Sequence, residues 1–184
     1  TLTRFKDTDL RGSYQFGDEG IPASRVPLVE DGILKTFLMS RSPLENVSRS
    51  NGHGRREPGR SVVSRQGNLI VESSNQVSIS QLRALLLEEC RKQGKKYGFL
   101  FQDITGGFTT TSRSGPQAFK VLPVVVYRAF VDGRPDQLVR GVDIVGTPLV
   151  CFSRILATGD DDAVFNGTCG AESGWVPVSA ISPS

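Results

Sequence analysis

In the first 75 residues, short apolar runs indicate β structure, and a polar, Gly-rich loop interrupts it over residues 42–60. Residues 25–30 and 33–40 carry such runs on either side of Asp31 and Gly32. An Asp-Gly pair favours a type I′ turn, because both central residues of that turn need a positive φ. The pattern therefore predicts a hairpin, followed later by another moderately alternating strand over residues 60–73.

One segment has helical spacing instead. Ser78 and Gln81 form a capping-box signature just ahead of an apolar stripe, and Gly94 stands where a helix commonly ends in a left-handed residue. The pattern predicts one main helix over residues 79–93. Its apolar stripe consists of Leu82, Leu85, Leu86 and Cys90, so we interpret Cys90 as a core residue.

The second half of the chain returns to segments rich in β-branched and aromatic residues. Asp132 and Gly133 mark a second hairpin turn, and Pro123 within a long apolar run indicates an edge strand or a bulge. With one helix among many strands, we predict an α+β fold, mainly antiparallel β-sheet, barrel- or sandwich-like. The predicted strands cover residues 97–102, 108–112, 119–130, 137–144, 149–156 and 175–179.

Composition narrows the classes of function. The chain has 184 residues, and no window approaches the roughly 18 consecutive apolar residues that span a bilayer, so we expect no membrane association. The net charge of +3 is dispersed without interleaved aromatics, so nucleic-acid binding is not expected. Three cysteines without paired spacing argue against a disulfide framework and favour a reducing, cytoplasmic compartment.

The single histidine, His53, limits metal chemistry more strongly. A catalytic zinc site generally has three protein ligands and an open position, with His the commonest ligand. A chain with one His cannot build a two-His site alone. Any metal that this chain binds is therefore expected to be shared with residues elsewhere.

Three segments carry candidate chemistry. Cys169 stands between glycines, which would let its thiol approach a metal or substrate; the alternative is a structural cysteine in a Gly-rich turn. Residues 50–58 place His53 between two glycines, ahead of two arginines and a glutamate that would grip a carboxylate or peptide backbone; the alternative is a mobile surface loop. Residues 160–162 are three acids, which we interpret as a solvated turn.

These segments, in this order, resemble the C-terminal part of the TldD/PmbA family of metallopeptidases, once described as modulators of DNA gyrase. No single stretch of sequence is specific to this family, but the complete set of stretches in this order is. The resemblance runs from about Arg11 to Pro183. The stretches that carry it are residues 11–13, 18–23, 28–35, 51–57, 103–107, 168–170 and 176–179.

The resemblance implies a metal site built by two His of an HExxxH helix and a cysteine near the C-terminus, which corresponds to Cys169. That helix and its glutamate, the expected general base, would lie upstream of Thr1. Residues 1–184 are therefore expected to be the C-terminal β-rich domain of a longer protein, without a catalytic residue of their own. Zinc is the expected metal, and it would activate water and polarise the scissile carbonyl.

The resemblance also implies dimers, homo- or heteromeric, with clefts that admit unfolded peptides. The alternative is a non-catalytic partner subunit or peptide-binding module, because family partners without the HExxxH helix can also carry Cys-Gly at this place. Two features depart from the family pattern, namely His53 and an extended region over residues 112–130. Peptide contact is expected from Asn51, Gly52, His53, Arg55, Arg56 and Glu57.

Overall fold

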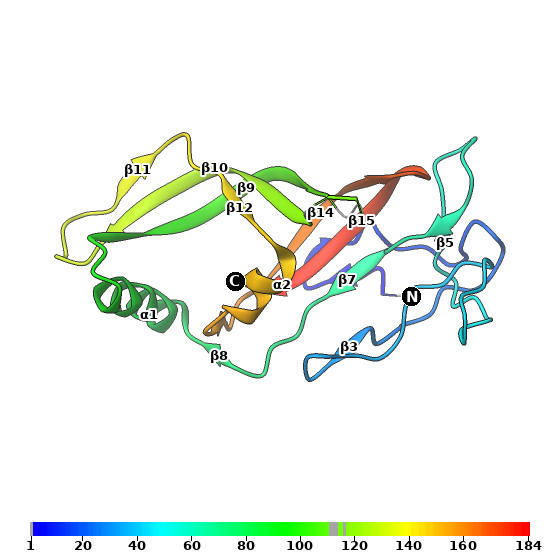
Figure 1. The fold of residues 1–184 in the computed structure, drawn as a ribbon, viewed down its shortest axis with the longest axis horizontal. Coiled ribbons are helices and arrows are strands. Elements are labelled where there is room, and N and C mark those ends of the chain that lie inside the picture. The colour runs from blue at the N-terminus through cyan, green and yellow to red at the C-terminus, as the bar shows by residue number, and fades with distance from the viewer. Residues whose placement is uncertain (1, 111–113, 116) are drawn as a thin grey trace. The chain divides into compact units, whose positions relative to one another are not determined.

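The computed structural model of the chain describes residues 2–110, 114–115 and 117–184 (Figure 1). The chain forms two compact units. The terminal unit consists of Thr1–Ser73 with Asp162–Ser184, and the central unit consists of Ser74–Asp161. In the described part of the chain, no helix is long and apolar enough to cross a membrane.

The main helix of the central unit, α1 (Ile79–Lys92), confirms the prediction. Its capping box is complete, because the Ser78 hydroxyl accepts from the backbone N–H of Gln81 and the Gln81 side chain accepts from the backbone N–H of Ser78. Gly94 follows with a φ of 66°, the left-handed conformation expected after a helix. Cys90 is buried and lies close to Gly98, as expected for a core residue.

A four-stranded antiparallel sheet forms the rest of the central unit's framework. Its strands are β9 (Tyr97–Thr110), β10 (Ala118–Phe130), β11 (Gln137–Val139) and β12 (Ile144–Gly146). β9 runs along one edge of β10, and β11 and β12 pair with the two ends of the other edge. Register shifts surround Pro123, which confirms the predicted bulge. β9 joins two predicted strands, and the end of the second, residues 111–112, lies outside the described residues.

Two predictions for the central unit are wrong. Residues 149–156 form no strand, because α2 (Pro148–Ser153) occupies this segment, with Pro148 at the first helical position. Periodicity alone does not distinguish a short apolar strand from a short apolar helix, and no residue of α2 is buried. Residues 137–144 are not one strand either, since the chain breaks at Gly141, whose φ is 73°. The structure adds a short parallel pair, β8 (Gln76–Val77) with β13 (Thr158–Gly159).

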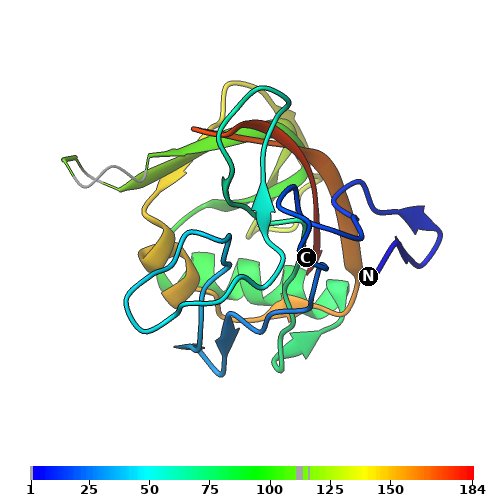
Figure 2. The ribbon, with the colours of Figure 1, turned by 90° about the vertical axis from the view of Figure 1, so that its right-hand side faces the viewer.

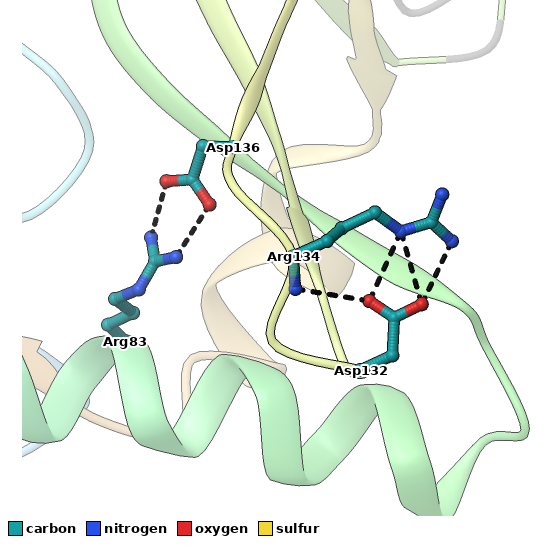
Figure 3. A network of polar contacts seen from close by, with 4 residues as sticks. All are labelled: Arg83, Asp132, Arg134 and Asp136. Atoms are coloured by element: carbon teal, nitrogen blue, oxygen red, sulfur yellow. Dashed lines mark hydrogen bonds and ion pairs between the residues drawn. The ribbon is translucent and has the colours of Figure 1, made fainter.

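The turn after β10 confirms the second predicted hairpin. Two aspartates of the β10–β11 connection bind arginines, as Figure 3 shows. Arg83 of α1 donates two hydrogen bonds of 2.8 and 2.6 Å to the Asp136 carboxylate. Arg134 binds the Asp132 carboxylate in the same turn. The hydrogen bonds from Arg83 hold the pKa of Asp136 below its usual value. Because these pairs are exposed to solvent, they orient the turn more than they stabilise the fold.

The terminal unit is built on a long antiparallel pair, β14 (Asp162–Ala171) and β15 (Gly174–Pro183), drawn in orange and red in Figure 2. β7 (Asn68–Ile70) adds to β15 in parallel. Val176, Val178 and Ile181 of β15 are buried, and Met39 of the same unit is buried too. Short pairs complete the unit: β1 (Arg4–Phe5) with β2 (Thr8–Asp9), β3 (Val29–Glu30) with β4 (Ile33–Leu34), and β5 (Gly54–Arg55) with β6 (Val63–Ser64).

The predicted first hairpin is confirmed, because Asp31 and Gly32 have φ values of 51° and 75° between β3 and β4. Its strands are shorter than predicted, and residues 60–73 divide into β6 and β7. The α+β class and the mainly antiparallel pairing are confirmed. The described strands form open sheets and close no barrel.

Candidate functional site

Cys169 lies within strand β14, directly opposite Val176 of β15. The Gly-rich turn weighed for this segment is therefore wrong, because the glycines beside Cys169 belong to a paired strand. Directly opposite residues of an antiparallel pair share a face of the sheet, so Cys169 lies on the face where Val176 is buried. Its thiol is free and half-buried.

The buried side chain of Arg65 holds the end of this hairpin. Its Nη2 donates to the carbonyl oxygen of Cys169 at 2.5 Å. Its Nη1 donates to Ser173 Oγ at 2.7 Å and to the carbonyl oxygen of Gly174 at 3.1 Å. One guanidinium therefore bridges both strands and the turn between them.

Two more charged residues, from the segment that contains β5, hold the same hairpin. Glu57 donates its backbone N–H to the Ser173 carbonyl at 2.8 Å, and its Oε2 accepts from the backbone N–H of Trp175 at 3.0 Å. Arg55 Nη1 donates to the carbonyl oxygens of Pro177 at 2.8 Å and Gln66 at 2.6 Å. The predicted segment 51–57 thus reaches the Cys169 hairpin through Arg55 and Glu57.

Two buried arginines lie near Cys169. Arg55 and Arg65 are 8% and 6% exposed, and neither forms an ion pair with an acidic side chain in the described part of the chain. Burial lowers the pKa of Arg55; Tyr14, Asp18 and Cys169 act to raise it, and Arg65 acts to lower it. Two buried guanidinium groups therefore bind the hairpin that carries Cys169.

His53 is buried in the terminal unit and is held by its own segment. Its Nδ1 lies 3.1 Å from the carbonyl oxygen and 3.0 Å from the side-chain oxygen of Asn51. Both neighbours are acceptors, so Nδ1 carries the hydrogen of the neutral ring. Burial lowers the pKa of His53 and Arg55 lowers it further, while the Asn51 carbonyl acts in the opposite direction.

We expect the chain to lose stability as the pH falls below about 6.5, the ordinary His pKa. Because the folded state has the lower His53 pKa, the unfolded chain binds more protons between the two pKa values, and stability there rises with pH. Urea unfolding at several pH values, compared with His53→Gln, isolates this contribution. The imidazole NMR signal of this sole histidine should titrate below 6.5; titration at or above 6.5 contradicts the prediction.

The rest of segment 51–57 is also built into the unit. The Asn51 side chain donates to the Phe37 carbonyl at 2.9 Å and accepts from the Met39 N–H at 2.8 Å. Arg56 alone in this segment is exposed, with its N–H bonded to Asp18 and its guanidinium to the Arg60 carbonyl. The mobile surface loop weighed for this segment is wrong. Whether the six predicted residues contact a peptide stays a prediction.

Sequence reasoning missed Arg65, Ser173 and Tyr14. Ser173 is fully buried, and the Tyr14 ring lies 4.6 Å from the Arg55 guanidinium carbon. Arg65 stands in a run that reads as a plain strand, so no local signal marks it. Only its long-range contacts to the hairpin, more than 100 positions away, single it out.

The metal-binding capacity of the described residues is limited to isolated ligands. Among them, no group of three or more His, Cys, Asp or Glu side chains is placed to hold a metal ion. Cys169 fits the role of a single thiolate ligand, since its thiol is free and half-buried, with Arg65 bound to its carbonyl oxygen.

Comparison with known proteins decides the family. The model of the PmbA/TldA metallopeptidase C-terminal domain matches residues 3–184. The chain belongs to the PmbA/TldD family. The resemblance found in the sequence is thereby confirmed.

Curated relatives of this PmbA/TldD domain are named metalloproteases. One from Archaeoglobus fulgidus is 29% identical over 172 residues, which are 94% of this chain and 37% of that protein. One from Methanocaldococcus jannaschii is 27% identical, covering 91% of this chain and 34% of that protein. A "Metalloprotease TldD homolog" from Buchnera aphidicola is 25% identical over 178 residues. The chain spans about a third of the length of these relatives. No solved structure matches it.

Proposed function

We propose that this PmbA/TldD domain is part of a zinc-dependent peptidase that acts on unfolded peptides, and that Cys169 is one ligand of the metal. The observation that carries the proposal is the free, half-buried thiol of Cys169, set in a paired strand whose end is held by Arg55 and Arg65. The family and the names of its relatives supply the reaction class.

Each residue of the site has a separate task in this proposal. Cys169 would hold the metal as a thiolate, while Arg65 and Glu57 fix the hairpin on which it stands. When bound, zinc supplies a Lewis acid that polarises a carbonyl group and lowers the pKa of bound water to about 7. The two His ligands and the general base are expected on an HExxxH helix outside residues 1–184.

The peptide and partner assignments follow from the family. We propose that segment 51–57 borders the peptide cleft, with the exposed side chain of Arg56 available for contact. The protein is proposed to act in the cytoplasm as a homo- or heterodimer. Arg56→Ala tests whether segment 51–57 borders the cleft. The KM for peptide hydrolysis is compared between this variant and the wild type.

The metal assignment is tested by replacing Cys169 with alanine in the complete gene product. Loss of a direct ligand should lower zinc affinity more than the about 10–100-fold that loss of an outer residue costs, and peptide hydrolysis should fall with the zinc content. Zinc is measured by atomic absorption after dialysis. Cys151→Ala, at an exposed cysteine of α2, serves as the control and should keep both properties. Retained zinc and retained hydrolysis in Cys169→Ala would refute the assignment.

A non-catalytic partner subunit is the competing function for this chain. The complete gene product distinguishes the two: an HExxxH on a helix supports the peptidase, and a complete product without one supports the partner. The two functions also differ in zinc content, because a partner without the two His ligands should not retain zinc after dialysis.

A further inference from the structure

The end of the hairpin that carries Cys169 is intrinsically weak. Only two residue pairs, Gly170 with Trp175 and Ala171 with Gly174, separate Cys169 and its partner Val176 from the turn. Two of the four residues in those pairs are glycines, which weaken strand interiors. Trp175 is 64% exposed, so this large side chain does not anchor the end by packing into the core.

Arg65 compensates for that weakness through three hydrogen bonds. Its guanidinium binds the backbone before the turn at Cys169, the turn at Ser173, and the backbone after the turn at Gly174. The planar fork of an arginine holds several acceptors in fixed directions, which a lysine cannot do. The guanidinium group thereby holds carbonyl oxygens of both strands in fixed positions relative to each other.

Arg65 is itself fixed in place. Its backbone N–H donates to the His53 carbonyl at 2.8 Å, next to the β5–β6 pair in which Gly54 faces Ser64. With its side chain buried and its backbone bonded, the guanidinium has little freedom to follow a moving hairpin. Glu57 adds a second anchor, at the backbone of Ser173 and Trp175.

The charge of Arg65 indicates what this arrangement serves. A buried guanidinium bonded only to carbonyl and hydroxyl oxygens is costly, because none of these acceptors neutralises it. Within the described residues it has no acidic partner, and the nearby Arg55 is cationic too. Its three hydrogen bonds to this hairpin, one of them to the carbonyl oxygen of Cys169 itself, offset part of that cost and tie the buried charge to the backbone of Cys169.

We propose that Arg65 is a positioning residue for the metal site, which holds the backbone of Cys169 so that its thiolate meets the metal in one fixed place. The inference rests on the proposed function of Cys169 as a metal ligand. It assigns to Arg65 a role that acts through Cys169, without contact between Arg65 and metal or peptide.

The test uses the complete gene product, stripped of metal and titrated with Co²⁺. A cobalt–thiolate bond gives a near-ultraviolet charge-transfer band that a structural defect elsewhere would not create or shift. We expect Arg65→Met to lower Co²⁺ affinity about 10–100-fold and to weaken or shift this band. Arg65→Lys should recover part of the affinity, and the matched control Arg60→Met, at an exposed arginine of the same unit, should behave as the wild type.

A milder variant separates positioning from folding. Ser173→Ala removes one of the three acceptors of Arg65 and keeps the bonds to Cys169 and Gly174, so it should fold with a smaller loss of stability than Arg65→Met, while its Co²⁺ affinity falls several-fold. If Arg65→Met does not fold, the Co²⁺ affinities and thiolate bands of Ser173→Ala and Arg65→Lys test the positioning role instead. Wild-type affinity and an unchanged band in the folded variants would overturn the inference.

The wild type and Cys169→Ala distinguish this inference from the function on which it rests. A band in the wild type that disappears in Cys169→Ala supports Cys169 as a ligand, and the Arg65 and Ser173 variants then decide the positioning role. A wild type with no thiolate band, or a band that Cys169→Ala retains, refutes the ligand and the positioning role together.

Discussion

Replacing Arg55 with methionine should lower the free energy of unfolding of the terminal unit by about 3 kcal/mol. The variant loses two charge-assisted hydrogen bonds, to Gln66 and Pro177, of about 1.5–3 kcal/mol each, and a stacking contact with Tyr14. Removing a buried cation offsets part of that loss. Urea unfolding followed by the fluorescence of Trp175, the single tryptophan, measures the change in this unit.

The adjacent arginine provides the control for Arg55. Arg56→Met removes the same charge one residue later, but from an exposed side chain with one hydrogen bond, to the Arg60 carbonyl. Its effect should stay within about 0.5 kcal/mol. Equal destabilisation by the two variants would mean that net charge, and not the internal contacts of Arg55, stabilises the unit.

Gly52→Ala should destabilise the terminal unit by at least about 3 kcal/mol. Gly52 has a φ of 84°, where an alanine costs about 1–2 kcal/mol from backbone strain alone. A Cβ at this position would also overlap the carbonyl oxygen of Pro22, which is backbone and cannot move aside cheaply. The same unfolding measurement reports the loss.

Gly59→Ala separates strain from overlap. Gly59 has nearly the same φ, 85°, but a Cβ there would meet nothing within 4 Å. It should therefore lose only the backbone part, about 1–2 kcal/mol. A Gly52→Ala variant no less stable than Gly59→Ala would show that the approach of Pro22 to Gly52 is not a tight constraint.

Local chemistry predicted the elements whose boundaries depend on a few neighbouring residues. The capping box at Ser78, the left-handed glycine at Gly94 and the Asp31-Gly32 turn all form as expected, because each is stabilised within its own turn of chain. Pro123 disturbs its strand as expected, because it lacks the N–H that the ladder needs. The prediction failed at residues 149–156, where periodicity does not distinguish a short apolar strand from a short apolar helix.

The candidate site could be predicted only in part. Glycines around Cys169 and His53 marked both segments, and the ordered motifs identified the family. Nothing local indicated that Arg55 and Glu57 turn inward to the Cys169 hairpin, or that Arg65 binds three of its acceptors. These contacts join residues separated by more than 100 positions, and a single sequence carries no record of such pairings.

By itself, the sequence determined the α+β class, the main helix, two hairpin turns and the family, and its single histidine showed that a two-His metal site cannot be completed within these residues. The tertiary structure decided that Cys169 lies in a paired strand and that three buried or half-buried charged residues hold that strand's end. The physical reason is the separation along the chain between the residues that interact. Turns and caps form within a few residues, whereas burying a guanidinium requires acceptors that only the complete fold brings together.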